Sequence, residues 1–390
     1  MQRIFPITGK SRAIHFLILI VLVAGTLFVC SPGSDEAIIL FVSKDQSDTT
    51  SLNPTRLQTA AELARGQHLQ NTGNSRTQVR HHFITYTGAE ETGARLARAF
   101  IQDNPAVVAL VGDINSTGTA LLADIARELE VPHISFFATD ESIAAGNPWS
   151  FSYRERLSHE TDAIMDLIQN HVRLERPLLI VNDLQNLAPR WQAVAGALRE
   201  TGRPEPDIIE VPRDRSDFTA DIEQFTATRI DFDGIISFLT AAQTEHLLQQ
   251  LSRAELAVPV LLSGIVFDYE NLIELAVIDL DLYSFAFAHT LGLHEGCDTF
   301  LNEFARQYRL SMGFRRIDSL GPWVFDGVMM LHECLEAHPT RDGIRQALAG
   351  FADHRMVGHV SFDATGSLAE RTFRLIRLEN GGIVPLEDDL

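Results

Sequence analysis

The sequence predicts an α/β protein with two Rossmann-like lobes, and two observations lead to this fold class. Apolar runs rich in valine, isoleucine and phenylalanine alternate with amphipathic helical patterns along most of the chain. This alternation is typical of βαβ units around parallel sheets with helices on both faces. A break at Gly146, Asn147 and Pro148 interrupts the alternation, and a second series follows it. Because 390 residues also exceed what one core usually holds, we expect two compact lobes.

The first series supplies four apolar runs with amphipathic segments between them. The run AVVALV, 106–111, has the unbroken apolar character of a strand that is buried on both faces. After it, Leu121, Leu122, Ile125 and Leu129 share one helical face. In chain order we predict strands at 37–42, 79–86, 106–111 and 132–136, and helices at 53–71, at 89–102 and around Leu121–Leu129.

The second series repeats the alternation after the break. Its first helix carries Ile164, Leu167, Ile168 and Val172 on one face, and a strand follows. We predict strands at 177–181, 207–211, 233–238 and 259–263, with helices around Trp191–Leu198, near 217–227 and around Leu247–Leu251.

Two turns rich in small polar residues follow consecutive strands of the first series. Asn115, Ser116, Thr117 and Gly118 follow the strand 106–111, and Ala138–Asp140 follow the strand 132–136. Parallel α/β sheets bind ligands beyond the carboxyl ends of their strands, where helix N-termini present N–H groups. The two turns are therefore able to hold a carboxylate or another polar head group. The alternative is that Ser116 and Thr117 only cap the following helix.

The N-terminus has the charge pattern of an export signal. Arg3, Lys10 and Arg12 precede the apolar run FLILIVLVAGTLFVC, Phe16–Cys30, and no acidic residue occurs before Asp35. A run of about fifteen residues is shorter than the roughly twenty that span a bilayer. We interpret residues 1–30 as a signal peptide, with an uncleaved anchor as the alternative, and residues 31–36 as a tether.

The three cysteines raise two questions in an exported chain. Cys30 closes the apolar run, as in lipoproteins whose first mature cysteine is lipidated, although Phe28 and Val29 stand where that pattern has small residues. The alternative is a cysteine that merely ends the run. Cys297 and Cys334 form either a disulfide, as is common in extracytoplasmic proteins, or two buried thiols.

Charge and motifs argue against nucleic-acid binding and against catalysis. The formal net charge is −20, and no basic stripe occurs, so the surface repels nucleic acid and anionic lipid.

LHECLEAH resembles a zinc-protease motif, but Glu336 replaces its second histidine, and we interpret the segment as an exposed helix with scattered histidines. The adjacent His81 and His82 face opposite sides of a strand, so we do not expect them to form a metal-binding pair. Nucleotide-binding and hydrolase motifs are absent, so we expect neither enzyme activity, nor a metal, nor a cofactor.

Segments along most of the chain resemble one family. AVVALVGDINSTGTALLADIARELEVPHISFFATD, NPWSFSY and DGIISFLTAAQTEHLLQQLSRAELAVPVLLSG are similar to the type I periplasmic solute-binding proteins, above all the leucine/isoleucine/valine-binding kind. The tail from FDGVMMLHECLEAH to GGIVPL is similar to the closing segment of that family. The resemblance covers roughly residues 37–386, and it rests on the order and spacing of these segments.

The resemblance implies two discontinuous lobes, three crossovers between them and a ligand cleft that closes by a hinge motion. We place the crossovers near 147–150, 264–267 and 362–366. The first lobe would then contain 37–148 with 267–362, and the second would contain 149–266 with 363–390.

The resemblance also implies ligand contacts. The two turns that hold the carboxylate and ammonium of an amino acid match Ser116 with Thr117, beside Asn115, and Ala138 with Thr139. In the second lobe, Leu187 and Ala188 replace an aromatic-glycine pair, and the uncharged Gln243 stands where the family has the acidic partner of the ammonium. We therefore expect a carboxylate or amide ligand without a free α-ammonium.

Two functions fit this resemblance. The first is a monomeric periplasmic protein that delivers a small polar ligand to an ABC permease. The second is a sensory ligand-binding protein that presents its closed form to a separate membrane receptor or kinase, because the same fold serves both.

Overall fold

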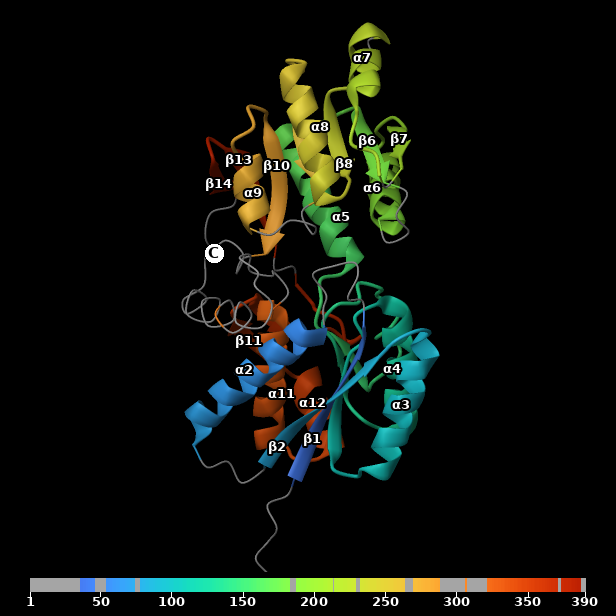
Figure 1. Cartoon of the computed structure of the whole chain (residues 1–390), viewed down its shortest axis with the longest axis vertical. Coiled ribbons are helices and arrows are strands. Elements are labelled where there is room, and N and C mark those ends of the chain that lie inside the picture. Colours follow the sequence, from blue (N-terminus) through green and yellow to red (C-terminus); the bar gives the residue numbers. More distant parts are fainter. Residues whose placement is uncertain are drawn as a thin grey trace, which may run out of the picture.

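The computed structural model describes two lobes stacked along the long axis of the molecule (Figure 1). Predictions that concern the apolar segment 16–30, Cys30 and Cys297 fall outside the described part of the chain. The described residues are 36–45, 54–73, 78–182, 187–212, 214–228, 232–263, 269–287, 306, 321–370 and 373–386.

A five-stranded parallel sheet forms the centre of the first lobe, as the first series predicts. Its strand order is β2-β1-β3-β4-β5, so the chain starts in the middle of the sheet and builds outward on both sides. The strands are β1 (Glu36–Lys44), β2 (Gln78–Tyr86), β3 (Val107–Val111), β4 (His133–Ser135) and β5 (Ser150–Ser152).

Helices cover both faces of this sheet because successive side chains of β1 point to opposite sides. Ile38, Leu40 and Val42 pack under α3 (Glu90–Asp103) and α4 (Ser116–Leu129). Ile39 and Phe41 face the other helices of the lobe. These are α2 (Pro54–Thr72), α11 (Gly321–Ala337) and α12 (Arg341–Ala349).

The second lobe is built on a seven-stranded sheet with the order β14-β13-β10-β9-β8-β6-β7. The run from β10 to β7 is parallel, and β13 and β14 add an antiparallel edge. The strands are β6 (Pro177–Asn182), β7 (Asp207–Val211), β8 (Gly234–Phe238), β9 (Val260–Leu262), β10 (Leu282–Phe287), β13 (Phe373–Glu379) and β14 (Gly382–Pro385).

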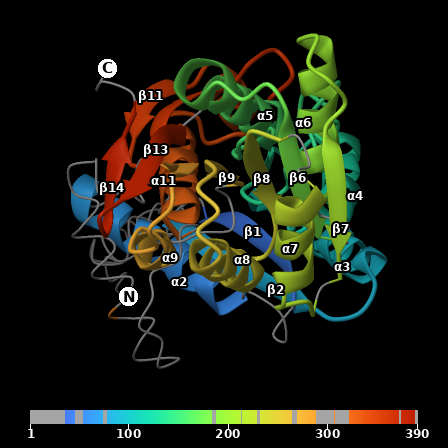
Figure 2. The same ribbon diagram turned by 90° about the horizontal axis from the view of Figure 1, so that it is seen from above.

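Helices also cover both faces of the second sheet (Figure 2). One face is covered by α5 (Leu157–Asp166), which continues into a π-helical segment (η1, Leu167–Val172), and by α6 (Ala188–Glu200). The other face carries α7 (Thr219–Thr228), α8 (Ala241–Arg253) and α9 (Tyr269–Leu275). A hairpin of β11 (Ala352–Arg355) and β12 (Gly358–Ser361) forms a separate two-stranded sheet.

The lobe boundary near residue 267 differs from the prediction. We assigned 267–362 to the first lobe, but β10 pairs with β9 and β13 in the second sheet, and α9 packs on that sheet as well. The reason is that β10 is an apolar run buried on both faces, and such a run fits either sheet until its pairing is known. The chain therefore leaves the second lobe after Phe287 and has entered the first by Gly321.

Two connections between the lobes lie side by side. β5 leads from the first sheet into α5, and residues 362–368 lead from the hairpin into β13. Ser152 pairs with Ser367 in a parallel bridge, so the two connections are joined through their backbones. The Arg156 guanidinium adds an ion pair to Asp363 and a 2.7 Å hydrogen bond to the carbonyl of Leu368. Rotation of one lobe about the other must therefore bend both connections together.

Helix α11 is a core helix, so the prediction of an exposed helix with scattered histidines is wrong. Thirteen of its side chains are buried, among them His332, which is 1% exposed. Cys334, on the same helix, is a free buried thiol, which matches the thiol alternative for this residue. The prediction that His81 and His82 face opposite sides is confirmed, because His81 contacts His332 of α11 whereas His82 stacks on Phe100 of α3.

No helix in the described part of the chain is both long enough and apolar enough to cross a membrane.

Candidate functional site

The candidate site begins at the carboxyl edge of the first sheet, where β3 leads into α4. The side chain of Asn115 caps the helix, and its Oδ1 accepts a 2.7 Å hydrogen bond from the N–H of Gly118. This leaves Ser116 half-buried and Thr117 exposed, and neither hydroxyl bonds to another described group. The first N–H groups of a helix also have no partner within the helix. The alternative that Ser116 and Thr117 act as caps is therefore wrong, since Asn115 is the cap.

Of the two residues predicted at the second turn, after β4, only Thr139 has a polar side chain. Thr139 is half-buried, and its hydroxyl has no hydrogen-bond partner among the described residues. Ala138 is buried, and its N–H donates to Ser135 Oγ at 3.2 Å, so this N–H already has a partner within the protein. The exposed Asp140 accepts bonds from the N–H and hydroxyl of Ser142. The free hydroxyls of Ser116, Thr117 and Thr139 thus occur on the turns that follow neighbouring strands.

A buried carboxylate beneath this edge fixes the first turn, and sequence reasoning missed its role. Asp113 is 1% exposed, and Oδ1 accepts from the N–H groups of Lys44, at 3.0 Å, and Ile114, at 2.5 Å. Oδ2 accepts from the hydroxyl of Tyr86. The carboxylate therefore ties the ends of β1 and β2 to the start of α4. Burial raises the pKa of Asp113, and the hydrogen bonds from Tyr86 and the backbone oppose that shift.

Close packing explains why small residues surround Asp113. A Cβ on Gly118 would lie 2.3 Å from Asp113 Oδ2, and one on Gly112 would lie 2.1 Å from the carbonyl oxygen of Val42. Gly112 also has a φ of +133°, which favours glycine. The hydroxyl of Thr119 completes the support by donating to the carbonyl oxygen of Asn115 at 2.6 Å. The glycine content of the turn is therefore a packing requirement.

An ion pair stands beside the turn. The ammonium of Lys44, at the end of β1, lies 2.7 Å from the carboxylate of Glu90, the first residue of α3. The amide of Asn115 donates to the same carboxylate at 3.4 Å. Both charged side chains are about one quarter exposed, at 24% and 23%, so the pair borders solvent. The hydrogen bond from Lys44 holds the pKa of Glu90 below its usual value.

The predicted contacts of the second lobe take structural positions. Gln243 is 3% exposed, and its Oε1 accepts from Asn182 Nδ2 at 2.5 Å and from the Thr240 hydroxyl. Its Nε2 donates to the carbonyl oxygens of Pro212 and Arg215. The amide of Gln243 therefore has all its hydrogen bonds within the protein. Together with Thr240 it forms the capping box of α8.

Leu187 precedes α6 and is buried at 3% exposure. The structure thus brings the hydroxyls of the first lobe to one sheet edge but gives Leu187 and Gln243 no open surface toward a ligand.

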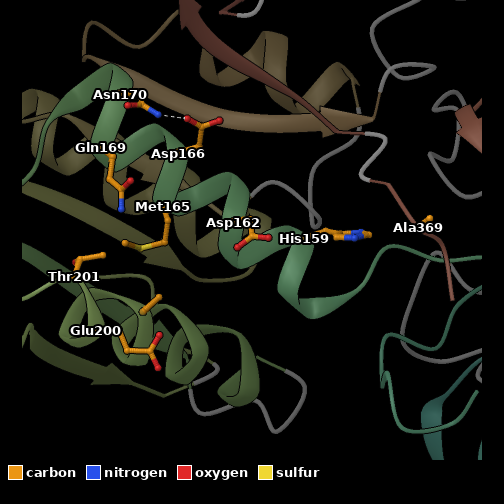
Figure 3. A pocket seen from close by; sticks show the side chains of 10 residues that line it. His159, Asp162, Met165, Asp166, Gln169, Asn170, Glu200, Thr201 and Ala369 are labelled. Carbon is orange, nitrogen blue, oxygen red and sulfur yellow. Dashed lines mark hydrogen bonds between the residues drawn. The ribbon is translucent and has the colours of Figure 1, made fainter. Parts of the chain in front are cut away.

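One groove is present in the second lobe, between α5 and α6 (Figure 3). Its volume is about 720 Å³, and Asp162, Asp166 and Glu200 give its walls a negative charge. Asn170 donates to Asp166 at 2.6 Å along its rim. None of the predicted ligand residues lines this groove. Its lining residues are His159, Asp162, Met165, Asp166, Gln169, Asn170, Ala197, Glu200, Thr201 and Ala369.

The described residues contain no group of three or more His, Cys, Asp or Glu side chains that could hold a metal ion.

Comparisons with known proteins agree with the two-lobe architecture. A family model described as periplasmic binding protein matches residues 77–382. Comparison with curated protein sequences finds no match. Solved structures match over most of both chains at low sequence identity, so they support the fold alone.

A putative branched-chain amino acid ABC transporter protein from Rhodospirillum rubrum has a TM-score of 0.70 and 19% identity, over 90% of this chain and all of the other. The branched-chain amino acid substrate-binding protein of Streptococcus pneumoniae, in complex with isoleucine, has a TM-score of 0.66 and 19% identity, over 89% and 97% of the two chains. A solute-binding protein of R. palustris, in complex with benzoate, has a TM-score of 0.66 and 15% identity, over 90% and 95%.

Proposed function

The chain belongs to the periplasmic binding protein family, and from this premise we propose that it captures a small carboxylate or amide in a cleft between its lobes. We further propose that it delivers this ligand to an ABC importer. The proposal rests on the polar groups that the structure places at the carboxyl edge of the first sheet. There the hydroxyls of Ser116, Thr117 and Thr139 have no hydrogen-bond partner among the described residues, and the α4 N-terminus adds partial positive charge.

The hydrogen-bonding groups on this edge favour an anionic or amide head group. Hydroxyls and backbone N–H groups can donate hydrogen bonds to the oxygens of a carboxylate or an amide, so no charged side chain is needed to bind such a head group. Among the acids near this edge, Asp113 is buried beneath the turn, Asp140 accepts from Ser142, and Glu90 is paired with Lys44. A free α-ammonium requires an acceptor of negative charge when a closed cleft excludes water.

The second lobe supports the same ligand class. The residue at the family's acidic position is Gln243, and its amide is fully engaged by protein groups. Among the solved structures of similar fold, one is a complex with isoleucine and another a complex with benzoate. Benzoate is a carboxylate that has no ammonium group, so this architecture accommodates such a ligand. We propose that this chain binds a ligand of the same general kind.

Export completes the proposed function. Residues 1–30 carry the positive region and apolar run of an export signal, and the family is named for its periplasmic members. We propose that the protein acts outside the cytoplasm, held to the membrane through a lipidated Cys30, and that a permease recognises its closed form.

Native mass spectrometry of protein purified without refolding tests the function. We expect a retained small molecule whose mass fits a carboxylate or amide, and whose signal falls in the double variant Ser116→Ala/Thr139→Ala. A retained nucleotide or metal ion, or the absence of any small molecule together with no response to a panel of carboxylates, would contradict the proposal.

A further inference from the structure

Three buried histidines meet where α2 packs against α11 and β2. They are His68 of α2, His81 of β2 and His332 of α11. The rings of His68 and His332 stack with their centroids 4.8 Å apart, and Nε2 of His81 lies 3.0 Å from Nε2 of His332. His68 and His332 are 4% and 1% exposed, and the side chain of His81 has no exposed surface. The ligand site described above uses none of the three.

The charged groups around the cluster are few and partly exposed. From α2, Glu62 Oε1 lies 3.2 Å from His81 Nδ1, and Arg65 lies 2.7 Å from the same carboxylate group. From α11, Glu336 Oε2 lies 3.6 Å from His68 Nε2. The carboxylates of Glu62 and Glu336 are 36% and 44% exposed, so water screens their attraction for a charged ring.

The contact between His81 and His332 is a hydrogen bond between two imidazole rings. Two facing ring nitrogens share one hydrogen, because one must donate while the other accepts. An additional proton must therefore go to an outer Nδ1 atom, and the ring that takes it becomes charged. Nδ1 of His332 is buried and has no hydrogen-bond partner, so the charge of a doubly protonated His332 ring would be uncompensated. Burial is the main reason why the pKa of His332 falls to about 2 and that of His81 is also lowered.

Helix α2 is held on the lobe by few large apolar side chains. Its buried side chains are Leu57, three alanines and His68, and the partly buried Leu63 also packs against the core. An alanine buries one methyl group, and apolar burial stabilises in proportion to the area removed from water. The imidazole contacts at His68 therefore form a large part of the attachment of the C-terminal half of this helix.

We propose that the buried pair His81 and His332, on which His68 stacks, forms an acid-sensitive contact, which holds α2 against α11 and β2 only while the rings of this pair are uncharged. Lowering the pH from neutral would weaken this contact. The proposal does not depend on which ligand the protein binds.

The sign of the effect follows from linkage. A histidine whose folded pKa lies below the unfolded value of about 6.5 binds its proton only after unfolding, so its contribution is fully present above that pH and is lost as the pH falls. With a folded pKa of about 2, His332 alone should raise the unfolding equilibrium constant by about 30-fold between pH 7.5 and pH 5.0. His81 adds to this effect in the same direction.

Urea unfolding of the purified full chain at both pH values tests the proposal. We expect His332→Gln to remove a factor of about 30 from the pH dependence seen in the wild type. The exposed His246→Gln on α8 is the matched control and should keep the wild-type dependence. Other buried titratable groups, such as His133 and Asp326, are common to all three proteins and cancel in the comparison. An unchanged dependence in His332→Gln would overturn the proposal.

Two measurements on the wild type keep the proposal testable if His332→Gln fails to fold. Ring-carbon NMR should show the His332 imidazole uncharged at pH 5.0, and a titration near 6.5 in the folded protein would contradict the proposal. Hydrogen exchange, corrected for the intrinsic effect of pH, should show that α2 loses more protection at pH 5.0 than α3 does. Equal losses in the two helices would show that the acid effect is not at this contact.

Discussion

At the scale of single residues, the proposed ligand edge rests on hydroxyl groups that make no hydrogen bond to another described residue. Ser116, Thr117 and Thr139 were predicted from their place after consecutive strands, and their hydroxyls make no hydrogen bond to a described group. Their role in ligand binding stays a prediction. Sequence reasoning did not foresee that Asn115 caps α4 or that protein groups occupy Gln243, because both depend on side-chain partners far along the chain or on exact turn geometry.

Thr139→Ala should weaken ligand binding by roughly ten- to a hundredfold, because a hydrogen bond to a charged acceptor contributes about 1.5–3 kcal/mol. Calorimetry with the molecule identified by native mass spectrometry measures this change. Thr161→Ala is the control, since Thr161 is also half-buried but bonds to the carbonyl of Leu157 within α5. Unchanged affinity in Thr139→Ala would remove this residue from the site.

Asp113→Asn should lower the free energy of unfolding by about 1.5–3 kcal/mol, the contribution of hydrogen bonds to a charged group. An amide has one oxygen, so it cannot accept at once from the two backbone N–H groups and from the hydroxyl of Tyr86. Urea unfolding at pH 7.5 measures the loss. Asp140→Asn, an exposed acid of the neighbouring turn, should stay within about 0.5 kcal/mol of the wild type. Equal stability in both variants would contradict the supporting role of Asp113.

At the scale of helices and strands, periodicity predicted most of the elements but not their partners. The strands at β1, β3, β6 and β8 follow directly from apolar runs. The strand β10 and its place in the second sheet were missed, because pairing with β9 and β13 is a long-range property. The burial of α11 was missed for a related reason. Its scattered histidines suggested exposure, whereas His332 is buried in the core.

The packing of α11 against the first sheet gives a sharp prediction. A Cβ at Gly327 would lie 2.1 Å from Phe136, a ring with no exposed surface that packs edge-on against Tyr153. Gly327→Ala should therefore destabilise the protein by about 1–3 kcal/mol through overpacking.

Gly66→Ala in α2 is the matched control, because nothing lies within 4 Å of its added Cβ. It should stabilise the protein by about 0.5–1 kcal/mol, since alanine is the better helix former. Chemical denaturation measures both variants. A Gly327→Ala variant as stable as Gly66→Ala would show that α11 is free to shift away from Phe136.

At the scale of the whole molecule, the order of segments predicted two lobes of the correct fold class. The two backbone connections at 150–152 and 362–368 lie beside each other, which suits a hinge, whereas the third connection runs between Phe287 and Gly321 and not near 264–267.

The monomeric state and the lipidation of Cys30 remain predictions. Cys30→Ser should release the protein from membranes, as fractionation would show, and unchanged membrane association would exclude the lipid anchor.

The proposed ligand class also depends on the whole molecule, because the proposed cleft would close and set groups of both lobes around one ligand. An amino acid would bring its ammonium into a poorly hydrated cleft, where leaving that charge unpaired costs several kcal/mol. The resemblance predicts that Gln243 occupies the position of the family's acidic partner, and its amide is already fully hydrogen-bonded. A carboxylate without ammonium avoids this cost and still uses the hydroxyls of Ser116 and Thr139.

A thermal-shift screen that pairs leucine, isoleucine and valine with their deaminated keto and hydroxy acids tests this reasoning, since each pair differs only at the ammonium. A ligand at a hundred times its Kd stabilises the folded state by about 2.7 kcal/mol, which raises the melting temperature measurably. We expect the deaminated acids, or other simple carboxylates and amides, to produce this shift and the amino acids to produce little. Stabilisation by the amino acids but not by their deaminated counterparts would mean that an acidic side chain does reach the ammonium. Glu90 would then be the first residue to replace, because its partly exposed carboxylate already contacts the amide of Asn115 beside the turn.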